Sequence, residues 1–219
     1  MCGIVGYVGP RSSMDVLVAG LARLEYRGYD SAGVAVVSEN DGLVSQKRAG
    51  KLAVLRDDVD AHPLASGGTG IAHTRWATHG APTDANAHPH LADGGKLALI
   101  HNGIIENFHE LREELIASGE QFLSETDSEV AAILLAHAFR ETGDLTTAMQ
   151  QVVKRLEGAF TLLVVHADKP GVVVGARRNS PLVIGVGEGE NFLGSDVAAF
   201  VAFTHKALSL GQDQIVTLT

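Results

Sequence analysis

Cysteine is scarce in this sequence, with one thiol among 219 residues. A single cysteine excludes an intrachain disulfide framework and any metal site built from several cysteines. Long hydrophobic runs are missing as well, because no uninterrupted apolar stretch approaches the roughly 20 residues that a membrane-spanning helix needs. The N-terminus also lacks the basic flank and the long apolar core of a signal peptide. These absences predict a cytoplasmic protein.

Basic residues are outnumbered: 17 Lys and Arg stand against 26 Asp and Glu, and the net charge is −9. Nucleic acids and anionic membranes both demand clustered Lys and Arg, so we expect neither as a partner. The hydrophobic content of 45% and the charged content of 20% are ordinary for a soluble globular protein. No internal repeat or linker rich in proline and serine divides the chain, and we predict one domain over residues 1–219.

Hydrophobic periodicity predicts strands and helices in separate blocks. Short segments rich in Val and Ile predict strands, and apolar residues at helical spacing predict helices. The expected strands are 3–8, 33–37, 69–72, 97–100, 160–165, 172–176, 182–186 and 215–218, and the expected helices are 13–26, 107–117, 128–140 and 145–156. Helices grouped between blocks of strands favour an α+β fold, with two sheets packed together and helices outside.

Polar residues gather between Thr69 and Asn107, where apolar strand material runs into loops. Loops attached to strand ends are where sites are usually built. His79, His88 and His90 are compatible with a zinc cluster or with histidines that cap loops by hydrogen bonding. Zinc sites on rigid elements show tight histidine pairs on one helix face, whereas prolines interrupt this stretch. The sequence therefore favours loop capping, and we expect no metal.

Four further features of the sequence have two interpretations each. Trp76 fits a core strand, or the wall or lid of a pocket, which its polar neighbours favour. Arg75 fits a surface ion pair or a ligand contact. Asn102 and Gly103 fit a hairpin turn, or an oxyanion hole made of a side-chain amide and a backbone N–H. Asp127 fits a helix N-cap or a carboxylate that faces a ligand ammonium group.

Six motifs together resemble the class II glutamine amidotransferases, over nearly the whole chain and in the family's order and spacing. They are MCGIVGYVG (1–9), LEYRGYDSAG (24–33), HTRWATHG (73–80), NAHPH (86–90), HNGIIEN (101–107) and SETDSE (124–129). The second and third are characteristic of the branch that acts on sugar phosphates. The resemblance implies an N-terminal nucleophile hydrolase fold: a four-layer αββα sandwich with two packed antiparallel sheets.

The resemblance also implies an activity and its partners. The expected reaction is hydrolysis of the side-chain amide of L-glutamine to glutamate and ammonia, with no cofactor. Ammonia then serves a second site on a sugar-isomerase part, which we expect to lie outside this chain. The full-length enzyme is expected to be a homodimer.

The family's site residues map onto this sequence one by one. Cys2 matches the nucleophile, and the Asn102 side chain and Gly103 backbone match the oxyanion hole. The remaining matches are Arg75, Thr78 and His79 for the substrate carboxylate, Asp127 for its ammonium group, Trp76 for the closing loop, and Arg27 as a buttress of the catalytic end.

Cys2 needs a base, because a thiol with a pKa near 8.5 is only a few per cent thiolate at neutral pH. Its own α-amine, with a pKa of about 7.7–8.0, can take the proton once Met1 has been removed. Two alternatives stay open at this stage. One is the glutaminase domain of a phosphoribosyl amidotransferase or an asparagine synthetase, and the other is a noncatalytic amino-acid-binding module with the same fold.

Overall fold

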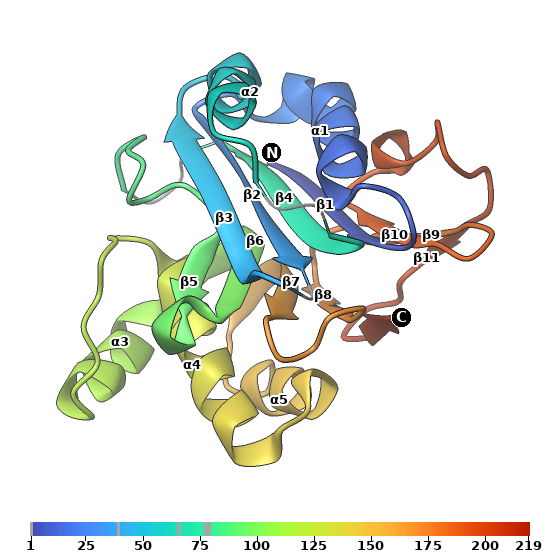
Figure 1. Ribbon diagram of the computed structural model, residues 1–219. Coiled ribbons are helices and arrows are strands. Elements are labelled where there is room, and N and C mark those ends of the chain that lie inside the picture. Colours follow the sequence, from blue (N-terminus) through green and yellow to red (C-terminus); the bar gives the residue numbers. More distant parts are fainter. Residues whose placement is uncertain (1, 39, 65–66, 77–79) are drawn as a thin grey trace.

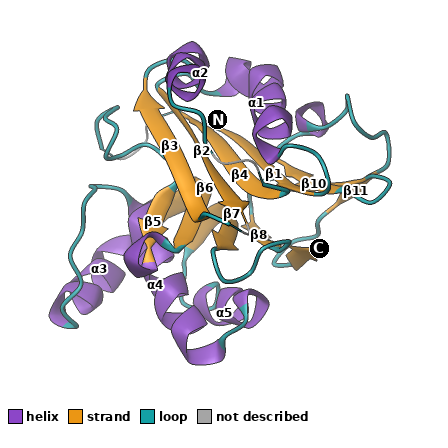
Figure 2. Cartoon of the chain, in the orientation of Figure 1, coloured by secondary structure: helices purple, strands orange, loops and turns teal. Residues whose placement is uncertain are grey.

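Two antiparallel sheets lie face to face in the computed structural model, which describes residues 2–38, 40–64, 67–76 and 80–219. Helices cover the outer face of each sheet, so that the chain forms four layers in the order αββα (Figure 1). This arrangement confirms the α+β fold that the sequence and the resemblance predict. Figure 2 shows the two orange sheets between purple helices.

Over the described residues, the first sheet has seven strands and the second has five. The first follows the order β11-β9-β10-β1-β4-β2-β3 and the second β12-β8-β7-β6-β5. In the first sheet the strands are β1 (Gly3–Val8), β2 (Ser31–Ser38), β3 (Gly42–Ala49), β4 (Thr69–Arg75), β9 (Val183–Val186), β10 (Asn191–Gly194) and β11 (Ala207–Ser209). In the second they are β5 (His90–Ala92), β6 (Leu97–Ile105), β7 (Gly158–His166), β8 (Val173–Arg178) and β12 (Ile215–Leu218).

Five α-helices form the two outer layers of the described chain. Helices α1 (Ser13–Leu24) and α2 (Leu52–Ala61) pack on the first sheet, and α3 (Phe108–Ala117), α4 (Asp127–Thr142) and α5 (Leu145–Val152) pack on the second. Helix α4 begins after Thr126, whose hydroxyl accepts a hydrogen bond from the backbone N–H of Glu129, and it ends at Gly143 with φ 65°. Among the described residues, no helix combines the length and apolarity needed to cross a membrane.

Alternation along the strands decides which side chain faces which layer. On β1, Val5 and Tyr7 join the apolar cluster under α1, whereas Ile4 and Val8 join the cluster between the two sheets. On β6, Leu99 faces the helices, while Ala98 and Ile100 face the other sheet. The space between the sheets is therefore filled by alternate residues from both.

The expected elements are present, and the structure contains several more that were not predicted from the sequence. Strand β3 is half-exposed along its whole length and shows no alternation of buried and exposed positions. Helix α2 buries only Leu52 and Leu55, so its helical stripe is narrow. Strands β5, β10 and β11 are three or four residues long. Such segments have little periodicity, because tertiary pairing rather than local pattern defines them.

Candidate active site

On three strands, the row of side chains that faces the other sheet (the inner row) ends in polar residues at one end of the molecule. Ile4 on β1, Ile71 on β4 and Ile100 on β6 belong to the core between the sheets. His73 and Asn102 come two residues after Ile71 and Ile100, on the same strand faces. Cys2 comes two residues before Ile4 and lies at the same end, because β1 runs antiparallel to β4. A cavity of about 380 Å³ opens where the apolar filling stops. Its lining comprises Cys2, His73, Arg75, Trp76, His88, His101, Asn102, Gly103, Ile104, Thr126, Asp127, Ser128, Ala159, Asn179, Ser180, Pro181 and Ser195.

Cys2 lies at the start of the chain's first strand with its side chain partly exposed. Its Sγ accepts a hydrogen bond from the backbone N–H of Trp76 at 3.1 Å. Burial raises the pKa of the Cys2 thiol above its ordinary value, and the Trp76 N–H opposes that rise because it favours the thiolate. The thiol is thus mainly protonated at neutral pH, and its use as a nucleophile requires a base.

Asn102 and Gly103 lie within strand β6, paired with Thr161 and Phe160 of β7. The hairpin-turn interpretation is therefore wrong. Asn102 Nδ2 donates to the Cys2 carbonyl oxygen at 2.9 Å, which brings the side-chain amide next to the cysteine. Gly103 has φ 129°, and a Cβ there would collide with the carbonyl oxygen of Ala159. Only glycine fits this position, where the backbone itself borders the cavity.

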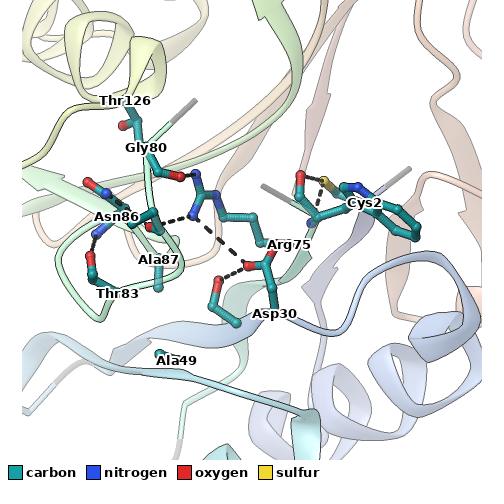
Figure 3. Close-up of polar contacts among 12 residues, drawn as sticks. Cys2, Asp30, Ala49, Arg75, Gly80, Thr83, Asn86, Ala87 and Thr126 are labelled. Carbon is teal, nitrogen blue, oxygen red and sulfur yellow. Dashed lines mark hydrogen bonds and ion pairs between the residues drawn. The ribbon is translucent and has the colours of Figure 1, made fainter. Parts of the chain in front are cut away.

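Arg75, the last residue of β4, is 3% exposed, so the surface ion-pair interpretation is wrong. Its guanidinium donates to the carbonyl oxygens of Gly80 and Ala81 at 3.2 and 3.3 Å, and it lies 4.0 Å from Asp30 Oδ1. Figure 3 shows these contacts around the labelled guanidinium. The group places a buried positive charge at the cavity and links β4 to the following loop.

Asp127 is the first residue of α4, and Thr126 before it is the N-cap, so the N-cap interpretation of Asp127 is wrong. Asp127 Oδ2 accepts a hydrogen bond from the backbone N–H of Ile105 at 2.8 Å. Its Oδ1 lies 3.8 Å from Nδ1 of His101. The side chain is 4% exposed, and it brings a carboxylate to the cavity from the second sheet's side.

Trp76 follows β4 and is 49% exposed, which contradicts a place in a core strand. Its ring meets Tyr29 edge-on at 5.3 Å, and both rings line a second hollow beside the cavity, together with Asp30 and Pro82. The pocket-wall interpretation fits this position. Of the other expected site residues, Thr78 and His79 lie outside the described residues, and so does the side chain of Arg27.

Three buried histidines pack against one another at the wall of the cavity, where His73 and His88 belong to the lining. The ring centroids of His73 and His88 are 4.2 Å apart, and those of His88 and His90 are 4.7 Å apart. Burial lowers the pKa of His73 to about 3, and it holds the pKa values of His88 and His90 well below their ordinary range. His90 Nε2 bonds to the Thr126 hydroxyl at 3.0 Å. In the described part of the chain, no three His, Cys, Asp or Glu side chains are arranged to hold a metal ion.

Several residues that line the cavity were not predicted as site residues from the sequence, including His73, Ser195 and the segment 179–181. A signal for His73 was available, because it shares its strand face with Ile71 and is a polar residue on an inner row. No such signal marks 179–181, since the segment follows β8 without belonging to an element. Its place in the lining depends on the packing of the sheets.

Residues 47–218 match the family model described as a glutamine amidotransferase domain. The chain belongs to the glutamine amidotransferase domain family. Over its whole length it is 68% identical to the glutamine–fructose-6-phosphate aminotransferase (isomerizing) of Leifsonia xyli subsp. xyli, and 65% identical to the enzyme of the same name from Streptomyces coelicolor. It spans 36% and 35% of the lengths of these two relatives.

Solved amidotransferases share the fold of this glutamine amidotransferase domain. The glutamine phosphoribosylpyrophosphate amidotransferase from B. subtilis superposes with a TM-score of 0.83 at 25% sequence identity, covering 99% of this chain and 47% of that one. The four-layer sandwich of N-terminal nucleophile hydrolases is thereby confirmed. A glutamine aminotransferase class-II domain protein from Silicibacter pomeroyi has a TM-score of 0.62 at 18% identity, over 99% of this chain and 94% of that one.

Proposed function

We propose that this domain hydrolyses the side-chain amide of glutamine to glutamate and ammonia through a thioester on Cys2. The observation that carries the proposal is the meeting of three segments at one cavity. Cys2 comes from the start of the chain, Asn102 from β6 and Asp127 from α4. In a member of the glutamine amidotransferase domain family, this set supplies a nucleophile, an amide donor and a carboxylate.

The first chemical step needs the free α-amine of Cys2. After Met1 is removed, this amine takes the thiol proton, and the thiolate attacks the amide carbon of glutamine. A C–S bond forms while the carbonyl π electrons move onto oxygen. The resulting oxyanion is stabilised by Asn102 and the Gly103 N–H. Asn102 Nδ2 carries two hydrogens, so a second N–H remains for the substrate beside the one given to the Cys2 carbonyl.

The second and third steps return the proton and release the products. The Cys2 ammonium donates its proton to the leaving nitrogen, the C–N bond breaks, and ammonia departs from the thioester. The amine then accepts a proton from a water molecule that attacks the thioester carbon. Breaking of the C–S bond releases glutamate and regenerates the thiol. One residue thus serves as nucleophile, base and acid.

The charged end of glutamine is held by groups of opposite sign. We assign its carboxylate to the end of the cavity where Arg75 lies, with Thr78 and His79, and its ammonium group to Asp127. Trp76 covers the bound substrate, and Arg27 supports the catalytic end. Burial of both charges supports this orientation. Arg75 and Asp127 line one cavity and are only 3% and 4% exposed.

For the whole protein we propose the reaction that its relatives' name states. Ammonia passes from this domain to a sugar-isomerase part, where fructose 6-phosphate becomes glucosamine 6-phosphate, and the full-length enzyme is a homodimer in the cytoplasm. The chain is 68% identical to a glutamine–fructose-6-phosphate aminotransferase but 25% identical to the phosphoribosylpyrophosphate enzyme. This difference favours the sugar-phosphate acceptor over the phosphoribosyl one.

The test starts from protein whose removal of Met1 has been verified by mass spectrometry. Glutamate and ammonia release is measured, and the protein is labelled with the glutamine-like electrophile 6-diazo-5-oxo-norleucine. We expect turnover and one adduct on Cys2, and neither in Cys2→Ala. Protein with a blocked or extended N-terminus should lose about 10²–10⁴-fold in rate, since its general base is gone. Full activity of the blocked form would overturn the mechanism, and binding of glutamine without turnover would favour the noncatalytic module.

The acceptor is tested separately with the full-length gene product. Amination of fructose 6-phosphate is compared with amination of phosphoribosyl pyrophosphate and aspartate. Formation of glucosamine 6-phosphate would support the proposed acceptor, whereas amination of another acceptor would overturn this part of the proposal.

A further inference from the structure

His73 and Asn102 face each other across the space between the two sheets. His73 follows Ile71 on the inner row of β4, and Asn102 follows Ile100 on the inner row of β6. Nε2 of His73 and Oδ1 of Asn102 are 2.8 Å apart, and the two residues are 1% and 9% exposed. The amide of Asn102 is therefore bonded at both ends, to His73 through its oxygen and to the Cys2 carbonyl through its nitrogen.

Hydrogen-bond complementarity decides how this amide is oriented. The Asn102 oxygen only accepts, so Nε2 of His73 must carry the hydrogen that lies between them. The opposite amide orientation would set the Asn102 oxygen against the Cys2 carbonyl oxygen, at the 2.9 Å now spanned by an N–H donor. Two acceptors at that distance have no hydrogen to share. His73 and the Cys2 carbonyl thus select one orientation, in which the donor end of Asn102 faces Cys2.

The surroundings keep the imidazole of His73 neutral. Burial, together with the neighbouring His101 and Arg75, lowers its pKa to about 3, although the hydrogen bond with Asn102 opposes this drop. A neutral imidazole has one N–H, and the bond to Asn102 uses it on Nε2. The backbone of His73 is held between the antiparallel strands β1 and β2, and its ring packs against that of His88. The donor is therefore fixed in direction as well as in protonation.

We propose that His73 is a positioning residue for glutamine hydrolysis, whose Nε2–H holds the Asn102 amide with its N–H groups toward the reacting carbon. This inference rests on the proposed function of the cavity. Without His73, the amide can turn or find other partners, and the oxyanion that forms on Cys2 attack loses a preorganised donor. Binding of the substrate's charged end involves other residues, so KM should change little.

Three variants test the proposal in active, Met1-processed protein. His73→Leu removes the donor, and we expect kcat to fall at least about tenfold with KM for glutamine within about twofold. His73→Gln places an amide N–H at the same reach and should restore kcat to within about threefold of wild type. Thr74→Val is the matched control on the same strand: Thr74 is 1% exposed, faces away from the cavity row and has a hydroxyl without a hydrogen-bond partner in the described residues. Its kcat should stay unchanged.

A double-variant cycle separates positioning from packing. If His73 acts through Asn102, His73→Leu should cost little further rate in an Asn102→Ala background. Equal fold-losses in both backgrounds would overturn the proposal, as would an unchanged kcat in His73→Leu. Because a core variant can fail to fold, ¹⁵N NMR of wild-type imidazoles provides a second test: the Nε2–H tautomer of His73 is expected, and the Nδ1–H tautomer would overturn the proposal.

The outcomes also separate this inference from the function on which it rests. Wild-type protein without glutaminase activity would overturn the proposed function and this inference together. Active wild type with full kcat in His73→Leu would overturn the role of His73 alone.

Discussion

The cavity has one half that is held by regular structure and one half that is held by a loop. Asn102 and Gly103 lie inside β6, and Asp127 is the first residue of α4. The backbone hydrogen bonds of a sheet and of a helix therefore position them. The loop half begins at Trp76 and continues through 80–89, between β4 and β5. The groups assigned to bond making lie in the first half, and those assigned to closing over the substrate lie in the second.

The loop half depends on a few long-range polar contacts. Asn86 donates from Nδ2 to Ala81 O and Glu125 Oε2 and accepts from the backbone N–H of Glu125. Lys47 Nζ donates to Ala87 O at 2.7 Å, and burial lowers its pKa to about 8. Individual hydrogen bonds of this kind contribute about 1 kcal/mol each. We therefore expect substitutions in the loop half to weaken substrate affinity and to leave kcat nearly unchanged.

The largest expected effect lies in the strand-held half. Asn102→Ala removes a donor for the oxyanion and should lower kcat at least about a hundredfold, with little change in melting temperature. Asn191→Ala on β10, a strand asparagine outside the cavity lining, is the matched control and should keep full activity. A mild loss in Asn102→Ala would contradict its assignment.

Acid should destabilise the strand-held half through its histidine stack. The folded pKa of His73 is about 3 against about 6.5 unfolded, so the unfolded chain binds more protons as the pH falls below 6.5. The stability that depends on neutral His73 is complete above pH 6.5 and is lost toward pH 3, by about 1.4 kcal/mol per pH unit. Urea unfolding at pH 7 and pH 5 measures this, and His73→Gln should flatten the dependence. An unchanged slope would contradict a neutral, buried His73.

Charge removal at the helix start should act on binding rather than on bond making. Asp127→Asn keeps an acceptor for the Ile105 N–H but loses the charge for the substrate ammonium, and KM for glutamine should rise about tenfold or more. Asp144→Asn at the N-cap of α5 removes a helix-start carboxylate elsewhere and should leave KM unchanged. An unchanged KM in Asp127→Asn would remove this role from Asp127.

The smallest effect is expected in the loop half. Asn86→Ala removes the contacts to Ala81 and Glu125 and should raise KM several-fold, on the order of 1 kcal/mol, with kcat within about twofold. Steady-state kinetics measures both. A loss in kcat larger than the change in KM would show that the two halves are not separable.

Much of the fold was accessible to sequence reasoning, because its central elements have strong periodicity. Strand β1 runs over the expected residues 3–8, and α3 begins one residue after its expected start. Strands β4 and β6 continue beyond their expected ends, to Arg75 and Ile105. Both extensions contain polar residues, which end an apolar pattern even where the backbone ladder continues.

The candidate site also has residues that the sequence predicts and residues whose role only the structure shows. Motifs singled out Cys2, Asn102, Gly103, Arg75 and Asp127, and all five line one cavity. His73 lies in the same motif as Arg75, yet its partner is visible only in three dimensions. The bond between His73 and Asn102 joins residues 29 positions apart on opposite sheets. Neither residue's neighbours in the chain indicate the other.

The amino-acid sequence by itself determined the central strands, their alternating faces and the residue types that carry the chemistry, since these follow from local periodicity and side-chain identity. Only the tertiary structure decided that Cys2 would lie against Trp76, that Asn102 would be oriented by His73, and that Arg75 would be buried beside its loop. Those contacts arise because two sheets close on each other and the apolar filling between them ends at one edge, a consequence of packing that no single segment contains.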